Sequence, residues 1–228
     1  MAREQLSDLF HEAAQITRKD VFGSGDELRP VYLKKDNILT GQIDVPSVGM
    51  VGPEYDGSVV ILSVNGAGAK DNVKSLQSSD RMYAALCNLR DAAPGASAQA
   101  AFEALNLAVI ASVPDWGVSK QHILKILEAV HKSVKDIAYL YLVPFRTRDD
   151  KGSTMNQKYF DAGYDRHLAR QLRALTPKVI IAIDRPSECA ARRFQIEAPQ
   201  TEVIYYTRKR DAHVERKATL AYLALRNF

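Results

Sequence analysis

Four short runs of apolar and β-branched residues, separated by longer helical patterns, constrain the fold of this 228-residue chain most strongly. Their only charged residues stand at the start of two of them, and the runs cover residues 58–64, 137–143, 178–183 and 202–206. Runs of this kind are typical of strands that are buried on both faces of a parallel sheet. Because helices connect parallel strands, the alternation predicts an α/β fold with helices over both faces of the sheet.

The segments between these runs have helical periodicity or helix-start signals. We expect helices at about residues 4–18, 79–90, 97–113, 120–131, 157–175, 187–194 and 214–226. Residues 23–53 are rich in Gly and Pro, with only short apolar clusters, which is typical of an extended arm. The prediction is therefore an N-terminal helix and arm over residues 1–50, packed on one α/β domain of residues 51–228.

The composition, 46% hydrophobic and 25% charged, is that of a soluble globular protein and excludes disordered and fibrous classes. The longest uncharged apolar run that we identify, Ile137–Phe145, is shorter than the ~20 residues that span a bilayer. The first five residues lack the apolar stretch of a signal peptide. We expect no membrane partner and a cytoplasmic location.

The two cysteines, Cys87 and Cys189, are too few for a disulfide framework or for a zinc or iron–sulfur ligand set. No histidine pair stands at the one-turn spacing of a zinc peptidase, and His122, His131 and His167 lie on expected helices without such a partner. We therefore expect no metal and no cofactor.

Charge is distributed unevenly along the chain. Residues 146–228 carry 17 basic and 10 acidic side chains, whereas residues 1–145 carry 14 and 17. A basic second half suggests a face that meets an anion such as a nucleic acid backbone, and an unevenly charged solvated surface is the alternative.

Ligands of parallel sheets bind at the carboxyl ends of the strands, so the loops at residues 65–72, 144–152 and 207–213 are the candidate site. In the first loop, the small residues Asn65, Gly66, Ala67 and Gly68 would let backbone amides approach a bound group. A tight strand-to-helix turn is the alternative. The loop has neither the third glycine of a dinucleotide fingerprint nor the Gly-Lys-Ser/Thr ending of a Walker loop.

The other two loops are basic. The second places Arg146 and Arg148 just past a strand, and the third holds Arg208, Lys209 and Arg210 between Tyr206 and His213. Arginines at strand ends can grip phosphates, and a basic triplet beside aromatic residues suits contact with a DNA backbone. A solvated basic turn is the alternative for each loop.

Two segments in the middle of the chain form a specific pattern. Tyr139–Arg146 is a predicted strand and loop, and His167–Ile183 is a predicted helix that leads into a "leucine, x, Pro-Lys-Val-Ile" strand. In this order the two segments resemble the strand, loop, helix and strand of the uracil-DNA glycosylase superfamily. The loop that begins at Asn65 follows the first strand, where the family keeps its "Gly-x-Asn-Pro-Gly" or "Gly-Glu-x-Pro-Gly" motif. The resemblance extends roughly from Val45 to the C-terminus.

The resemblance implies a three-layer α/β/α sandwich with a central four-stranded parallel sheet, and a base flipped out of DNA into a pocket at the sheet edge. The side-chain amide of Asn65 would orient the attacking water by hydrogen bonding. It would not act as the base, because an amide cannot take up a proton at neutral pH. Polar donors on the last loop would stabilise the departing base. Substrate-binding positions would be Gly66, Ala67, Gly68, Tyr141 and Thr207.

Three motifs differ from the family pattern. Gly66-Ala67 stands where the family has Pro after the acidic or amide residue, and Tyr141 stands where the family has a base-reading Asn. Thr207-Arg208-Lys209 replaces His-Pro-Ser, so that Arg208, Lys209 or His213 would have to supply the leaving-group donor. The sequence predicts a divergent glycosylase with Asn65 and His213 as catalytic candidates. A DNA- or nucleotide-binding module without catalysis, or an unrelated α/β enzyme for a nucleotide or sugar phosphate, are the alternatives.

Overall fold

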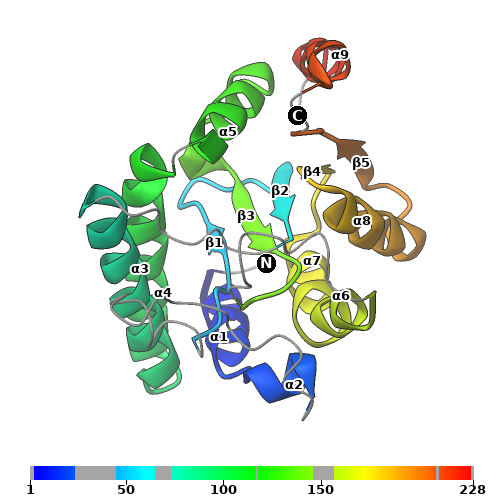
Figure 1. Ribbon diagram of the computed structural model, residues 1–228. Helices are drawn as coiled ribbons and strands as arrows, with labels where there is room; N and C mark the ends of the chain where they lie inside the picture. Colours follow the sequence, from blue (N-terminus) through cyan, green and yellow to red (C-terminus); the bar gives the residue numbers. More distant parts are fainter. Residues whose placement is uncertain are drawn as a thin grey trace.

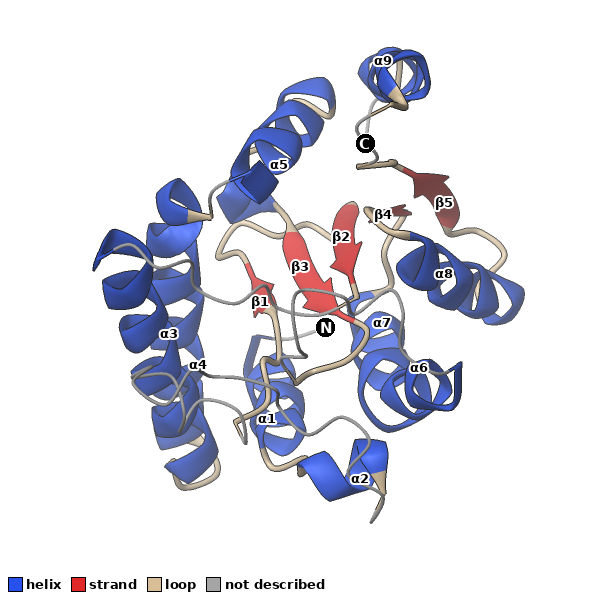
Figure 2. Ribbon diagram, in the orientation of Figure 1, coloured by secondary structure: helices blue, strands red, loops and turns tan. Residues whose placement is uncertain are grey.

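The computed structural model describes residues 3–23, 45–64, 73–116, 118–145, 157–208 and 211–226, without the side chains of residues 73–80 and 118–119 (Figure 1). Within these ranges the chain has a mixed α/β architecture. A five-stranded sheet lies at its centre, and helices surround the sheet (Figure 2).

The strands are β1 (Met50–Val51), β2 (Val59–Ser63), β3 (Ala138–Tyr141), β4 (Val179–Ala182) and β5 (Glu202–Tyr205), in the spatial order β1-β3-β2-β4-β5. The four strands expected from the apolar runs are confirmed, and they pair in parallel. The expected four-stranded, all-parallel sheet is wrong in one respect, because β1 adds a fifth, antiparallel edge strand against β3. A strand of two residues is too short to show any periodicity, and it lies in the segment whose glycines and prolines indicated an arm.

Helices were expected in seven segments, and each contains a helix in the structure. The bounds are α1 (Arg3–Ala14), α2 (Arg18–Phe22), α3 (Val73–Asp91), α4 (Ala96–Ser112), η2 (Val113–Asp115), α5 (Val118–Ala129), η3 (Val134–Asp136), α6 (Gln157–Gly163), η6 (Tyr164–Leu168), α7 (Ala169–Leu175), α8 (Arg185–Glu197) and α9 (His213–Ala224). Figure 1 shows α5 and α9 on one side of the sheet and α6, α7 and α8 on the other.

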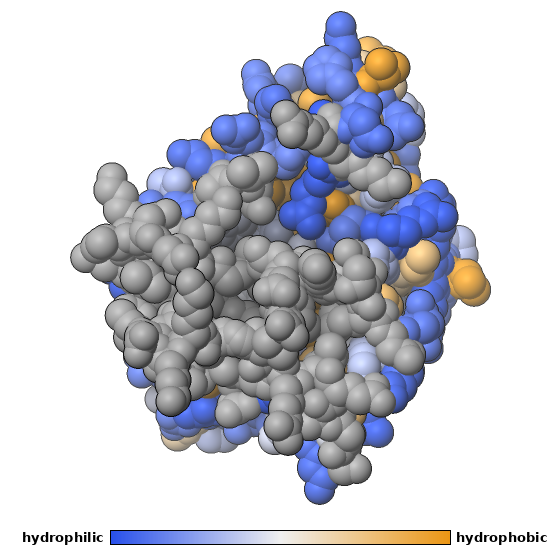
Figure 3. All heavy atoms as spheres, viewed as in Figure 1, coloured by the Kyte–Doolittle hydropathy of each residue, from blue (hydrophilic) through white to orange (hydrophobic). Residues whose placement is uncertain are grey.

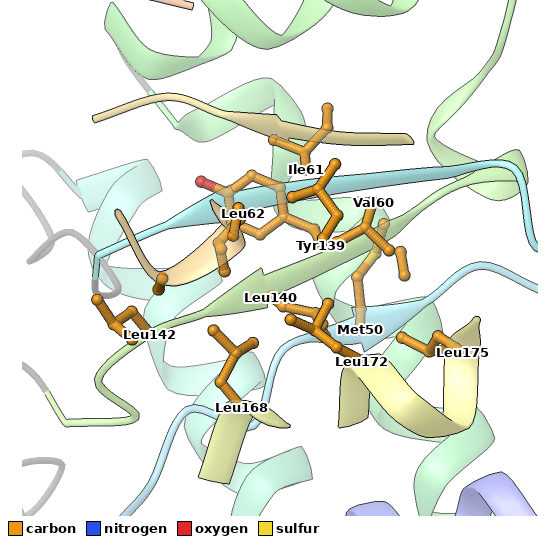
Figure 4. Packing of buried hydrophobic residues seen from close by; sticks show 14 of the residues in the cluster. Met50, Val60, Ile61, Leu62, Tyr139, Leu140, Leu142, Leu168, Leu172 and Leu175 are labelled. Carbon is orange, nitrogen blue, oxygen red and sulfur yellow. The ribbon is translucent and has the colours of Figure 1, made fainter. Parts of the chain in front are cut away.

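Alternate residues of the buried strands supply two packed faces. Leu140 points toward Leu168 and Leu172 of the helices below the sheet, whereas Ile61 and Tyr139 point to the opposite face (Figure 4). All five side chains are buried. The α1 helix adds apolar side chains to the same core.

The helical segment 157–175 is continuous but contains one π-helical turn, η6, between α6 and α7. The apolar stripe predicted for it is buried at every position, Phe160, Tyr164, Leu168, Leu172 and Leu175. Gly163 allows the close approach of this helix to the sheet, because a Cβ at that position would lie 2.4 Å from the carbonyl oxygen of Leu142. The helix is thereby packed against the carboxyl end of β3.

Among the described residues, one helix, Ala96–Asp115, is long and apolar enough to cross a membrane by length and composition alone. The segment is not an uncharged apolar run, because it contains Glu103. Core helices of soluble proteins have the same composition, and this one packs against α1 and α3 with Phe102 and Leu105 fully buried.

Candidate functional site

Asp184 connects the carboxyl ends of the central strands β2 and β4. It follows β4, and one of its carboxylate oxygens accepts a hydrogen bond of 2.9 Å from the backbone N–H of Val64, the residue after β2. The other oxygen accepts the N–H of Ser187 at 3.0 Å and so caps the N-terminus of α8. Since a side-chain cap satisfies a donor that the helix leaves unpaired, Asp184 fixes both the exit of β2 and the start of α8.

Arg208 reaches the same point from the end of β5. Its Nε donates to the carbonyl oxygen of Ile183 at 3.0 Å, and its Nη2 lies 3.7 Å from the carboxylate of Asp184. About a third of the side chain is exposed (35%), and Thr207, the residue before it, is buried. The sheet edge therefore presents a guanidinium that is anchored at one end and accessible to solvent at the other.

Aromatic side chains line the edge beside β3. The ring centroids of Tyr139 and Tyr141 lie 5.3 Å apart in an edge-to-face arrangement. Trp116, which directly follows η2, packs on Tyr139 with the ring centroids 5.2 Å apart. Burial raises the pKa of Tyr139 to about 12, against the opposing effects of Arg208 and of a hydrogen bond with Ser63. Tyr139 is therefore a neutral hydroxyl in the core, and Tyr141 is its partly buried neighbour at the strand end.

A histidine on α5, one of the helices that cover the sheet, lies at the same carboxyl edge. The Nδ1 atom of His122, on α5, lies 3.1 Å from the hydroxyl oxygen of Tyr206, which follows β5. Burial lowers the pKa of His122 below its ordinary value, and the positive charges of Arg208, Arg216 and Lys125 lower it further. The imidazole is therefore neutral at pH 7, when a ring nitrogen can accept or donate a proton.

Three of the residues that the sequence singled out lie at this edge, namely Tyr141, Thr207 and Arg208. A fourth, His213, is an exposed residue at the start of α9. The remaining predictions, for Asn65, Gly66, Ala67, Gly68, Arg146, Arg148, Lys209 and Arg210, lie outside the described residues. The described residues after β2 end at Val64, directly before Asn65.

Two residues of the edge were missed by sequence reasoning. Asp184 had a local signal, because it stands between the strand 178–183 and Pro186, in the position of a helix cap. His122 had none, because its partner Tyr206 is 84 residues away in the sequence. Spacing along a single helix cannot reveal such a pair.

No family model matches the chain, and no curated protein matches it significantly. The function proposed below therefore depends on the chemistry of the carboxyl edge.

That chemistry combines an accessible cation, the partly buried ring of Tyr141 and a neutral imidazole. In the part of the chain that the structure describes, no group of three or more His, Cys, Asp or Glu side chains could hold a metal ion. The edge is suited to an anionic or planar ligand, because a guanidinium binds oxyanions and aromatic rings stack on bases.

Proposed function

We propose that this protein is a divergent uracil-DNA glycosylase-like enzyme, which binds DNA and hydrolyses the N-glycosidic bond of a flipped, deaminated or damaged base. One observation supports this proposal above the others. Tyr141 and Thr207, which the resemblance places at substrate-binding positions, and Arg208, which the basic loop predicts to contact phosphate, lie at one edge of the parallel sheet. The loop of Asn65 begins directly after Val64, whose N–H binds Asp184 at that edge.

The roles follow from the chemistry of each group. Tyr141 offers an aromatic ring, held against Tyr139, on which an extruded base would stack. The base leaves as an anion when the N-glycosidic bond breaks, and the anchored guanidinium of Arg208 would stabilise that charge. Asn65 would orient the attacking water through its amide.

The proton of that water needs an acceptor. Asp184 is a poor candidate, because its carboxylate already accepts two backbone N–H groups and lies beside Arg208. His122 is neutral and partly exposed, so in the described part of the edge it is our candidate base. His213 is the candidate that the sequence supplies.

The test is product formation on defined DNA. Single-stranded and duplex oligonucleotides that carry uracil, hypoxanthine or a thymine mismatch are incubated with the protein, and alkaline cleavage reveals abasic sites. We expect product from at least one of them, and loss of product in Asn65→Ala. The exposed Asn88 on α3 gives the matched control, Asn88→Ala, which should retain activity. Intact DNA in every reaction would exclude the catalytic proposal.

A second candidate is a binding module that keeps the basic edge without catalysis. The contacts of Asp184 favour it, because this largely buried carboxylate at the edge is used for two backbone hydrogen bonds and not for proton transfer. This candidate predicts salt-dependent DNA binding without abasic product. The same oligonucleotides therefore distinguish the two.

A further inference from the structure

Glu188 is a buried carboxylate between two exposed arginines. It lies in the first two turns of α8, and only 6% of its side chain is exposed. Its Oε2 atom accepts a hydrogen bond from Nη1 of Arg185, and its Oε1 atom accepts one of 3.0 Å from Nε of Arg192. A buried carboxylate is costly unless it is paired, so both guanidiniums are held to it.

The two arginines themselves remain accessible. Their side chains are 72% and 55% exposed, and among the described residues Glu188 is their only hydrogen-bond partner. A guanidinium has five N–H donors, of which these contacts use one each. The remaining donors of Arg185 and Arg192 are therefore available to a ligand.

This pair continues the candidate site. Asp184 and Glu188 stand four residues apart at the start of α8, and each holds arginine side chains at the surface. Arg208 lies beside Asp184, whereas Arg185 and Arg192 donate hydrogen bonds to Glu188. On the side of the molecule where α8 lies, Figure 3 shows hydrophilic side chains together with exposed apolar ones.

Other arginines nearby differ in a decisive way. Arg193, on the same helix, pairs with Asp165 at 2.6 Å and stacks on the ring of Tyr164. Arg173, on α7, donates two hydrogen bonds to Glu197. These guanidiniums join α6, η6, α7 and α8 to one another, whereas Arg185 and Arg192 join no other described element.

We propose that Arg185 and Arg192 bind neighbouring phosphates of a nucleic acid strand, and that Glu188 is the positioning residue that fixes the two guanidiniums side by side. The choice of a nucleic acid as the ligand rests on the proposed function. The new element is the course of the nucleic acid backbone, which would run from the sheet edge along α8. Arginine suits this task, because its planar fork matches the geometry of a phosphate. One carboxylate holds both forks, which are therefore close enough to serve adjacent phosphates.

The experiment measures binding alone, with a single-stranded oligonucleotide that contains no target base. Fluorescence anisotropy gives the dissociation constant over a series of salt concentrations. Each lost phosphate contact lowers the slope of log K against log salt by roughly 0.7 for single strands, so the double variant R185Q/R192Q should lower it by about 1.4. The double variant R173Q/R193Q removes the same charge from exposed side chains and should leave the slope unchanged.

A third variant separates positioning from charge. Glu188→Gln raises the net charge by one, so charge alone predicts tighter binding. We expect weaker binding, because the amide no longer holds both guanidiniums. Thermal unfolding checks that each variant is folded. Because R185Q/R192Q removes both charged partners of a buried carboxylate, R185Q and R192Q are also measured singly, since each leaves one guanidinium on Glu188, and each should lower the slope by about 0.7.

The outcomes are separable from those of the proposed function. Absence of abasic product leaves this inference intact, because the oligonucleotide here carries no target base. Equal slopes for R185Q/R192Q and the unchanged protein would overturn the inference, as would failure of the unchanged protein to bind. Tighter binding by Glu188→Gln would overturn the positioning role.

Discussion

His167 makes the folded protein sensitive to acid. The residue lies in η6, it is buried, and neither ring nitrogen has a hydrogen-bond partner among the described residues. Burial lowers its pKa from the ordinary 6.5 to about 3, and among the described residues no charged group contributes to the shift. The folded protein therefore keeps this ring neutral under conditions in which the unfolded chain protonates it.

The size of the effect follows from proton linkage. Between pH 6.5 and about 3 the unfolded chain binds a proton at His167 that the folded protein does not, so the free energy of unfolding falls as the pH falls. From pH 7.5 to pH 5.0 this single group lowers it by about 2 kcal/mol, at ~1.4 kcal/mol per pH unit below 6.5. Above pH 7.5 it contributes almost no pH dependence.

The assay compares urea unfolding at pH 7.5 and pH 5.0. His167→Leu and His167→Gln remove the titrating ring, and either variant should lose about 2 kcal/mol less than the unchanged protein between these pH values. Other titrating groups are common to all three proteins and cancel in the comparison. His131, which is exposed and has a φ of 53°, gives the control His131→Asn, with a pH dependence like that of the unchanged protein. If both His167 variants also lose as much stability as the unchanged protein, His167 is not a neutral buried group and the reasoning fails.

Three further substitutions test the fold around the site, each by urea unfolding at pH 7.5. Asp184→Ala removes the cap of α8 and leaves the buried N–H of Val64 without its partner, so it should lower the free energy of unfolding by roughly 2–4 kcal/mol, and a change below about 0.5 kcal/mol would contradict both contacts. Gly163→Ala should cost roughly 1–3 kcal/mol, because the new methyl group would press on the carbonyl oxygen of Leu142; unchanged stability would show that helix and strand are farther apart. Tyr206→Phe removes the hydroxyl partner of His122 and should cost about 1 kcal/mol, and an equally stable variant would contradict that hydrogen bond.

The sheet was predictable because its strands are buried on both faces. The run at 178–183 is apolar after Lys178, and the corresponding strand β4 is buried at every position. The helix at 157–175 was predictable for a related reason, because its apolar stripe repeats at helical spacing and packs on the sheet. Burial imposes a period on the sequence, and the period can be read without a structure.

Other features leave no such period. The strand β1 pairs two residues with β3, and its hydrogen bonds are made by backbone atoms that any side chain allows. The contact between His122 and Tyr206 depends on the tertiary packing that brings α5 near the end of β5. No local sequence pattern encodes that packing. The π-helical turn at Tyr164–Leu168 likewise has no sequence signal that we can identify.

Asp184 connects the two proposals physically. Its carboxylate fixes the end of β2, from which the loop of Asn65 departs, and it also fixes the first turn of α8, which carries Arg185 and Glu188. A base held at the sheet edge and a phosphate held on α8 would therefore be positioned by the same side chain. Because a misplacement of a reacting group by about 1 Å can reduce a rate roughly a hundredfold, this shared anchor would matter more for catalysis than for binding. A binding module would tolerate loosening at Asp184, whereas a glycosylase would not.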